Sequence, residues 1–124
     1  MTEGARVLKE FHNVRQEPAG GRRRWFDGDR MELVVWYDTA GAISGFQLCY
    51  VLVEDEFALT WRRDAGLSHN RVDGEDPSTR GQTPLLVAAC DVPWEEIEMR
   101  FQAESAELEP AVRELVAARL ATRD

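Results

Sequence analysis

Three apolar runs separated by short polar breaks constrain the fold of this chain more than any other feature. The runs cover residues 31–37, 43–53 and 57–61, and the breaks between them cover residues 38–41 and 54–56. Apolar runs of strand length joined by short turns are typical of hairpins in series. The sequence therefore predicts an antiparallel β-meander over this region.

Alternation along the middle run predicts which side chains share a face of the sheet, because successive residues of a strand point to opposite sides. Phe46, Leu48 and Tyr50 fall on one face, and Cys49 and Val51 fall on the other. An antiparallel sheet with one solvated face would be apolar on one side only. Both faces of this strand therefore need a cover.

From residue 91 the apolar spacing changes to that of helices. Pro93 fits the first turn of one helix, preceded by Asp91 or Val92, and Pro110 fits the start of a second. The apolar stripes of the two helices are Trp94, Ile97 and Phe101, and Val112, Leu115, Val116 and Leu120. Two such stripes can cover one face of a sheet. The predicted fold is α+β: an antiparallel meander of about four to six strands, then two C-terminal helices packed on one face, in a single domain over residues 1–124.

The flanking segments give weaker signals. Residues 5–15 fit either a helical face or an extended edge strand. A short strand ends at Phe26, and the sequence Asp27-Gly28-Asp29 is typical of a turn. Residues 66–72 and 84–89 are predicted as two further strands, the second of them buried.

Composition limits the classes of partner. The formal net charge of −8 argues against nonspecific nucleic-acid binding, and we expect no nucleic-acid partner. No apolar run reaches the roughly 18 residues of a membrane span, and no secretory signal is visible, so we expect no membrane partner and a cytoplasmic location. Cys49 and Cys90 lack the spacing of a metal or redox motif, and we expect buried thiols with no metal and no cofactor.

Three segments carry a resemblance to a known group: RWF at residues 24–26, GFQLCY at 45–50 and ALTW at 58–61. Together they resemble a group of small bacterial proteins to which no activity is assigned. The resemblance covers about residues 11 to 90. It implies a single domain and implies no chemistry.

One set of side chains has the chemistry to bind an anion. Arg24, Arg62 and Arg71 could hold a phosphate or carboxylate if they converge, with Trp61 stacking on an organic group and His69 nearby. The alternative is a solvated basic edge that deters aggregation. Ser68 cannot be activated by its neighbour His69, because adjacent residues of a strand point apart.

Two functions from different classes follow. The first is a non-enzymatic homodimer or interaction module that pairs through the second face of the sheet, with Trp36 and Val34 at the interface. The second is a binder of a small anionic metabolite in the pocket of arginine and tryptophan described above. The first is favoured, because the predicted helices suffice for one face only.

Overall fold

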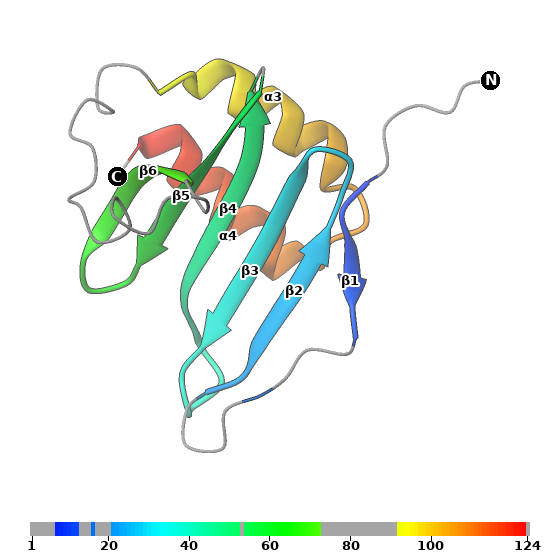
Figure 1. Ribbon diagram of the computed structural model, residues 1–124. Helices are drawn as coiled ribbons and strands as arrows, with labels where there is room; N and C mark the ends of the chain where they lie inside the picture. Colours follow the sequence, from blue (N-terminus) through cyan, green and yellow to red (C-terminus); the bar gives the residue numbers. More distant parts are fainter. Residues whose placement is uncertain (1–6, 13–15, 17–20, 53, 73–91, 124) are drawn as a thin grey trace.

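The computed structural model describes residues 7–12, 16, 21–52, 54–72 and 92–123 of the chain. Its strands form one six-stranded antiparallel sheet in the order β1-β2-β3-β4-β5-β6, so neighbours in sequence are neighbours in space (Figure 1). The strands are β1 (Lys9–Phe11), β2 (Arg23–Asp27), β3 (Met31–Tyr37), β4 (Ile43–Leu52), β5 (Asp55–Arg62) and β6 (Gly66–Val72). The predicted meander is confirmed.

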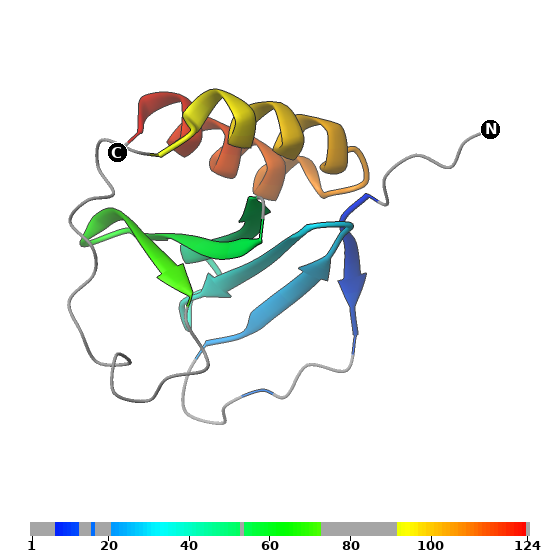
Figure 2. The same ribbon diagram turned by 45° about the horizontal axis from the view of Figure 1, so that its top comes forward.

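Two helices follow the sheet, α3 (Trp94–Glu104) and α4 (Pro110–Thr122), and both lie across the same face of it (Figure 2). The fold is therefore α+β with the helices at the C-terminal end, as predicted. Pro93 is the N-cap residue of α3, so this helix begins one residue later than the sequence predicts. Pro110 is the first residue of α4, where a missing N–H costs no hydrogen bond. No helix of the described residues is long and apolar enough to cross a membrane.

The core lies between the helices and the face of the sheet that they cover. Leu48 on β4 is flanked by Leu33 on β3 and Leu59 on β5, and all three are fully buried. From the helices, the predicted stripes supply buried side chains: Ile97, Phe101, Val112, Val116 and Leu120. Burying side chains of this size stabilises a domain by about 1.5–3 kcal/mol each relative to leaving them in water.

The structure also bears on the predictions made for the segments that flank the meander. Of the two alternatives for residues 5–15, the extended one fits residues 9–11, which pair with β2. The weaker strand at 66–72 is a full edge strand, β6, paired along its length with β5. The predicted strand at residues 84–89 and Cys90 lie outside the described residues.

The β2–β3 hairpin is tied to the end of α3 by the buried residue Glu104. Its side chain accepts a hydrogen bond from the backbone N–H of Asp29 (3.2 Å), and its carbonyl accepts one from the N–H of Leu8 (2.8 Å). The turn itself closes through a bond of 2.9 Å from Gly28 N–H to the carbonyl of Met31, which confirms the predicted turn. A Cβ at Gly28 would overlap the Glu104 carboxylate, so any larger residue here must displace that carboxylate.

We predict that Gly28→Ala lowers the free energy of unfolding by about 1–2 kcal/mol, because the new methyl group displaces the buried carboxylate. In a Glu104→Ala background the same substitution should cost much less, since the clashing oxygen is gone. Urea denaturation of the two single variants and the double variant measures this. Equal costs in both backgrounds would contradict the assigned contact.

Candidate functional site

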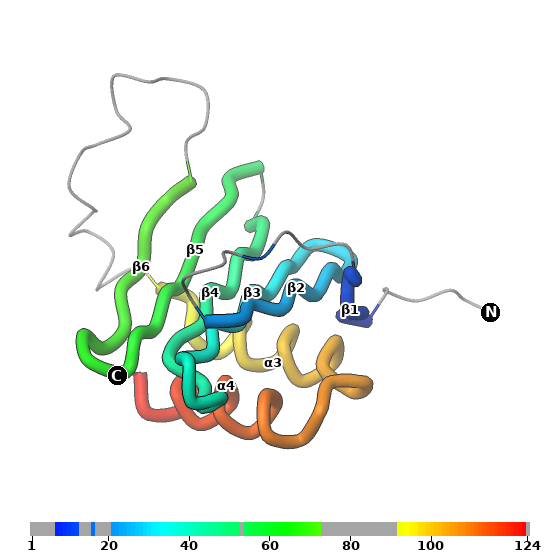
Figure 3. The backbone as a smooth tube through the Cα atoms, turned by 90° about the horizontal axis from the view of Figure 1, so that it is seen from below, coloured from blue at the N-terminus to red at the C-terminus, as the bar shows by residue number. Residues whose placement is uncertain are grey.

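The side of the sheet opposite α3 and α4 is the candidate functional surface, and we call it the helix-free face. Figure 3 shows both helices on one side of the six strands. The strand register places every second residue on the helix-free face, in rows that cross the sheet. The back of β4 here is not fully covered: Gln47, Cys49 and Val51 are each partly exposed.

The central row of this face is apolar or uncharged. It runs across the strands through Phe11, Trp25, Val34, Gln47 and Thr60. Phe11 is 51% exposed, whereas Val34 is already buried at 8%. The side-chain amide of Gln47 donates a hydrogen bond to the Thr60 hydroxyl (3.1 Å), which pairs one polar group of each side chain. This bond lowers the polar cost of removing water from the centre.

One end of the helix-free face is basic and aromatic. Its row contains Arg23, Trp36, Gly45 and Arg62. The Trp36 ring lies against Gly45, where a Cβ would be 3.2 Å from the ring carbon Cε3. The Arg62 guanidinium sits 4.4 Å from the centroid of the same ring, in a cation–π contact. Trp36 is thus on the surface that the sequence predicted, partly buried by these neighbours.

The other end of the helix-free face is mainly acidic, with Lys9 beside Asp27 at the β1 edge. Glu32, Cys49 and Glu56 bring one carboxylate oxygen, one thiol and one further carboxylate oxygen within 4.8 Å of one another. Burial raises the pKa of Glu32, and the negative charges of Asp27 and Glu56 raise it further. Burial, followed by the charges of Glu56 and Glu32, raises the pKa of the Cys49 thiol to about 12. The thiol is therefore protonated at neutral pH and unreactive.

A hollow of about 170 Å³ borders this acidic end, lined in part by Asp27, Asp29 and Arg30. The three clustered side chains are of kinds that can ligate a divalent cation. Burial and the neighbouring acids raise the pKa values of Glu32 and Cys49. A bound cation would relieve the repulsion between these acids.

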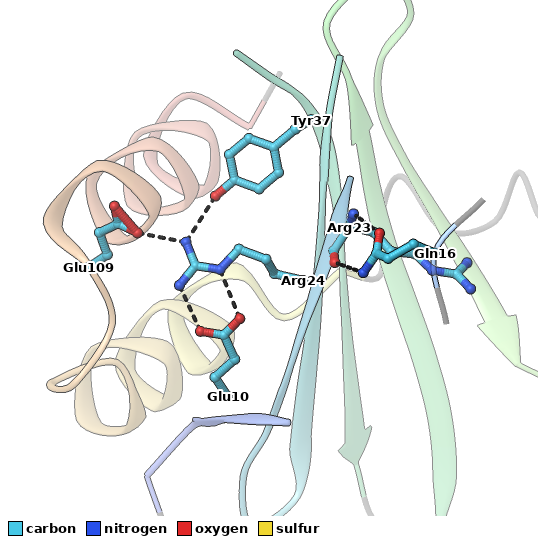
Figure 4. A network of polar contacts seen from close by, with 6 residues as sticks. All are labelled: Glu10, Gln16, Arg23, Arg24, Tyr37 and Glu109. Carbon is cyan, nitrogen blue, oxygen red and sulfur yellow. Dashed lines mark hydrogen bonds and ion pairs between the residues drawn. The ribbon is translucent and has the colours of Figure 1, made fainter. Parts of the chain in front are cut away.

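Arg24, a predicted anion ligand, is instead the centre of a clamp between the sheet and α4 (Figure 4). Its guanidinium donates two hydrogen bonds to the Glu10 carboxylate (2.9 and 2.7 Å), one to Glu109 (2.6 Å) and one to the Tyr37 hydroxyl (3.2 Å). These contacts raise the pKa of Arg24, and the bonds from Arg24 lower the pKa of Glu10. Two carboxylates already neutralise this cation.

Beside the clamp, the side chain of Gln16 completes the edge of β2 beyond the end of β1. Its amide donates to the backbone carbonyl of Arg23 and accepts from the Arg23 N–H, both at 2.9 Å (Figure 4). The pair of bonds has the donor and acceptor pattern of a neighbouring strand. A strand edge that would otherwise be open to other chains is thereby occupied.

A second hollow, of about 480 Å³, adjoins the clamp and is lined by Arg22, Tyr37, Asp38 and Glu109 among others. The guanidinium of Arg22 lies 5.4 Å from the centroid of the Tyr37 ring. The lining therefore contains both signs of charge and does not form a purely basic site.

His69 lies on the helix-covered side of β6 and packs among aromatic rings. Its Nε2 shares a hydrogen bond of 2.6 Å with the Tyr50 hydroxyl, and its ring stacks on Phe57 at 5.4 Å between centroids. Burial lowers the pKa of His69 and raises the pKa of Tyr50 to about 12. The Nδ1 atom is buried and has no hydrogen-bond partner among the described residues. His69 is therefore held in its neutral form.

The remaining predicted ligand residues are not brought together. Trp61 is buried in the core, 5.8 Å from the Phe46 ring and under the Arg119 guanidinium at 5.2 Å. Arg62 lies on the opposite face of the sheet, and Arg71 pairs with Asp55 at 3.4 Å. Arg24 and Arg71 lie on β2 and β6, four strand spacings apart, or about 19 Å at about 4.8 Å per spacing.

Sequence reasoning missed the partners that decide these roles: Glu10, Tyr37, Tyr50 and Glu109. Nothing in the local sequence marks Glu109 as a partner of Arg24, because the two are 85 positions apart. Tyr50 could have been recognised from the sequence, because it lies on the buried face of an apolar strand. The hydroxyl of a buried tyrosine needs a hydrogen-bond partner.

Comparison with known proteins gives no match: no family model, no curated protein and no solved structure is similar to the chain.

We predict that Arg24→Met lowers the free energy of unfolding by about 1–3 kcal/mol at neutral pH, because it leaves Glu10 and Glu109 without their shared cation. Since the pKa of Glu10 is lowered in the native state, its contribution is complete above the ordinary value of 4.5 and is lost as pH falls through the lower native value. The difference between wild type and variant should therefore shrink below that pH. Arg22→Met, a neighbouring exposed arginine, is the control, and an equal loss there would contradict the clamp.

We also predict that His69 makes the protein less stable as the pH falls from about 7.5 towards 5.5, with a slope of at most about 1.4 kcal/mol per pH unit. The native pKa is lowered below the ordinary 6.5, so the unfolded chain takes up the proton first and gains from it. His69→Gln should flatten the profile measured by urea denaturation at each pH. Ser68→Ala, at the exposed neighbouring residue without a titrating group, should leave it unchanged.

Proposed function

We propose that this protein is a non-enzymatic interaction module that pairs with a second copy of itself through the helix-free face. The observation that carries the proposal is the position of the two helices, which both lie on one side of the sheet. The opposite side keeps aromatic and apolar side chains at its surface, with Phe11 at 51% and Val72 at 41% exposure. These two residues lie on the opposite edge strands β1 and β6, with the partly exposed Trp25 and Trp36 between them, and exposed aromatic and apolar side chains on one face are typical of an interface.

The size of the helix-free face is compatible with a pair of copies. Six strands spaced at about 4.8 Å and about 20 Å long present roughly 500–600 Å². Stable interfaces bury on average about 800 Å² per partner, with a lower limit near 600 Å². This face is at the small end of that range, so we expect a reversible dimer rather than a permanent one.

A small anionic ligand is the second candidate. The hollow of about 480 Å³ beside Arg22 and Arg24 supports it, because arginine is the side chain best suited to hold a phosphate or carboxylate. The arrangement favours it less than self-association, since Arg24 is paired with Glu10 and Glu109 and the hollow is itself lined by Asp38 and Glu109.

We predict that Thr60→Lys weakens self-association at least tenfold without lowering the melting temperature. The substitution puts a charge at the centre of the helix-free face, where pairing would desolvate it. Sedimentation equilibrium over about 1–500 μM protein measures the dissociation constant. Met99→Lys is the matched control, because Met99 is 65% exposed on α3, in the other layer, and should not affect pairing. A wild-type protein that stays monomeric over this range would contradict the proposed function.

A further inference from the structure

The charges of the helix-free face are separated along the strands, and this separation specifies how two copies can meet. On β2 the face carries Arg23, Trp25 and Asp27 in order along the strand. On β5 it carries Arg62, Thr60, Ala58 and Glu56, again from the basic end to the acidic end. Both strands change from positive to negative across an uncharged central row.

We infer that the two copies pair about a two-fold axis through the central row, perpendicular to the strands, so that the basic end of each copy lies over the acidic end of the other. This inference rests on the proposed function and names its partner and geometry. A two-fold interface is isologous, so one patch must be complementary to itself. With the strands reversed, Arg23 faces Asp27, and Arg62 lies next to Glu56. With the strands aligned, the basic rows of the two copies lie over each other.

The reversed arrangement can be followed residue by residue on the register. A rotation about the central row places Arg62 of one copy over Ala58 of the other, beside Glu56 on the same strand and the same face. It places Arg23 over Asp27, and Trp36 over Glu32. Trp25, Val34 and Thr60 each meet their own counterparts at the axis. The apolar residues are then at the centre and the charges are at the rim, as is usual in interfaces.

The acidic end gains most from this pairing. Glu32, Cys49 and Glu56 crowd two carboxylates and a thiol within 4.8 Å, and their strongest neighbouring charges are one another and Asp27. Within the described chain, the Arg62 side chain has its recorded contact with the Trp36 ring rather than with a carboxylate. A guanidinium that is already stacked is pre-positioned and loses little conformational freedom on pairing.

A divalent cation is the competing occupant of the acidic end, since the same three side chains could ligate it. The partner's guanidinium is favoured because the basic row lies on the same face, and the rotation brings Arg23 over Asp27 and Arg62 next to Glu56. The two occupants differ in one measurable way: pairing through a metal ion requires the ion, and pairing through arginine does not.

The test is a charge-swap cycle on the exposed residues Arg62 and Glu56. Arg62→Glu and Glu56→Arg should each raise the dimer dissociation constant about tenfold or more, because symmetry repeats the repulsive contact twice. The variant with both substitutions should return to within about threefold of wild type, since each new glutamate again faces an arginine. Sedimentation equilibrium in EDTA and low salt gives the constants, and melting temperatures verify that all variants are folded.

The outcomes separate the inference from the function on which it rests. The reversed arrangement is supported if each single variant dimerises more weakly than wild type and the double variant regains the wild-type dissociation constant. A wild-type dimer that neither single variant weakens overturns it and leaves self-association standing. A dimer that forms with added Zn²⁺ and is absent in EDTA overturns it in favour of the cation. A wild-type monomer under all these conditions overturns the inference and the proposed function together.

Discussion

The sheet has two faces, and the described residues contain two helices that could cover them; the rest of the structure depends on which face those helices take. Both helices lie on one face, where Leu33, Leu48 and Leu59 are fully buried. Among the described residues, the other face is covered only by its own side chains. Trp36 lies across Gly45, and Val34 is buried at 8% among its neighbours. Such local covering is partial, because side chains of one sheet layer cannot remove their own outer surfaces from water.

Polar contacts anchor the ends of the helices on the face that they cover. The Arg24 clamp ties β1, β2 and β3 to the start of α4, and Glu104 ties the β2–β3 turn to the end of α3. The connection between the two helices therefore has anchored residues on both sides, Glu104 and Glu109. Apolar packing favours the covered face, because the buried residues Leu33, Leu48 and Leu59 point to it and the other face carries charged rows at both ends. Buried or half-buried charged contacts have stricter geometry, and they distinguish one arrangement from the other.

Much of the fold could be predicted from the sequence because alternation and turn residues are local signals. The runs 31–37, 43–53 and 57–61 correspond to β3, β4 and β5, and Pro110 begins α4. The candidate ligand site could not be predicted in the same way. Whether Arg24 binds a ligand or a carboxylate depends on residues 14 and 85 positions away, and the neutral state of His69 depends on burial that no local pattern reports. Convergence of distant side chains is a property of the packed state.

The net charge of the chain limits how two copies could pair through the helix-free face. At a formal charge of −8, two copies repel each other at long range, and this repulsion is screened beyond about 10 Å at moderate salt. A pair must therefore gain its free energy from contacts at close range. Burial of apolar surface around Trp25 would stabilise the pair whichever way the two copies are oriented, because the hydrophobic effect is not directional. The separation of Arg62 from Glu56 supplies the preference for one orientation, because aligned strands would add like-charge contacts to a pair that is already repelled. In the proposed pair, charge on this face would act mainly on specificity, and the apolar row mainly on affinity.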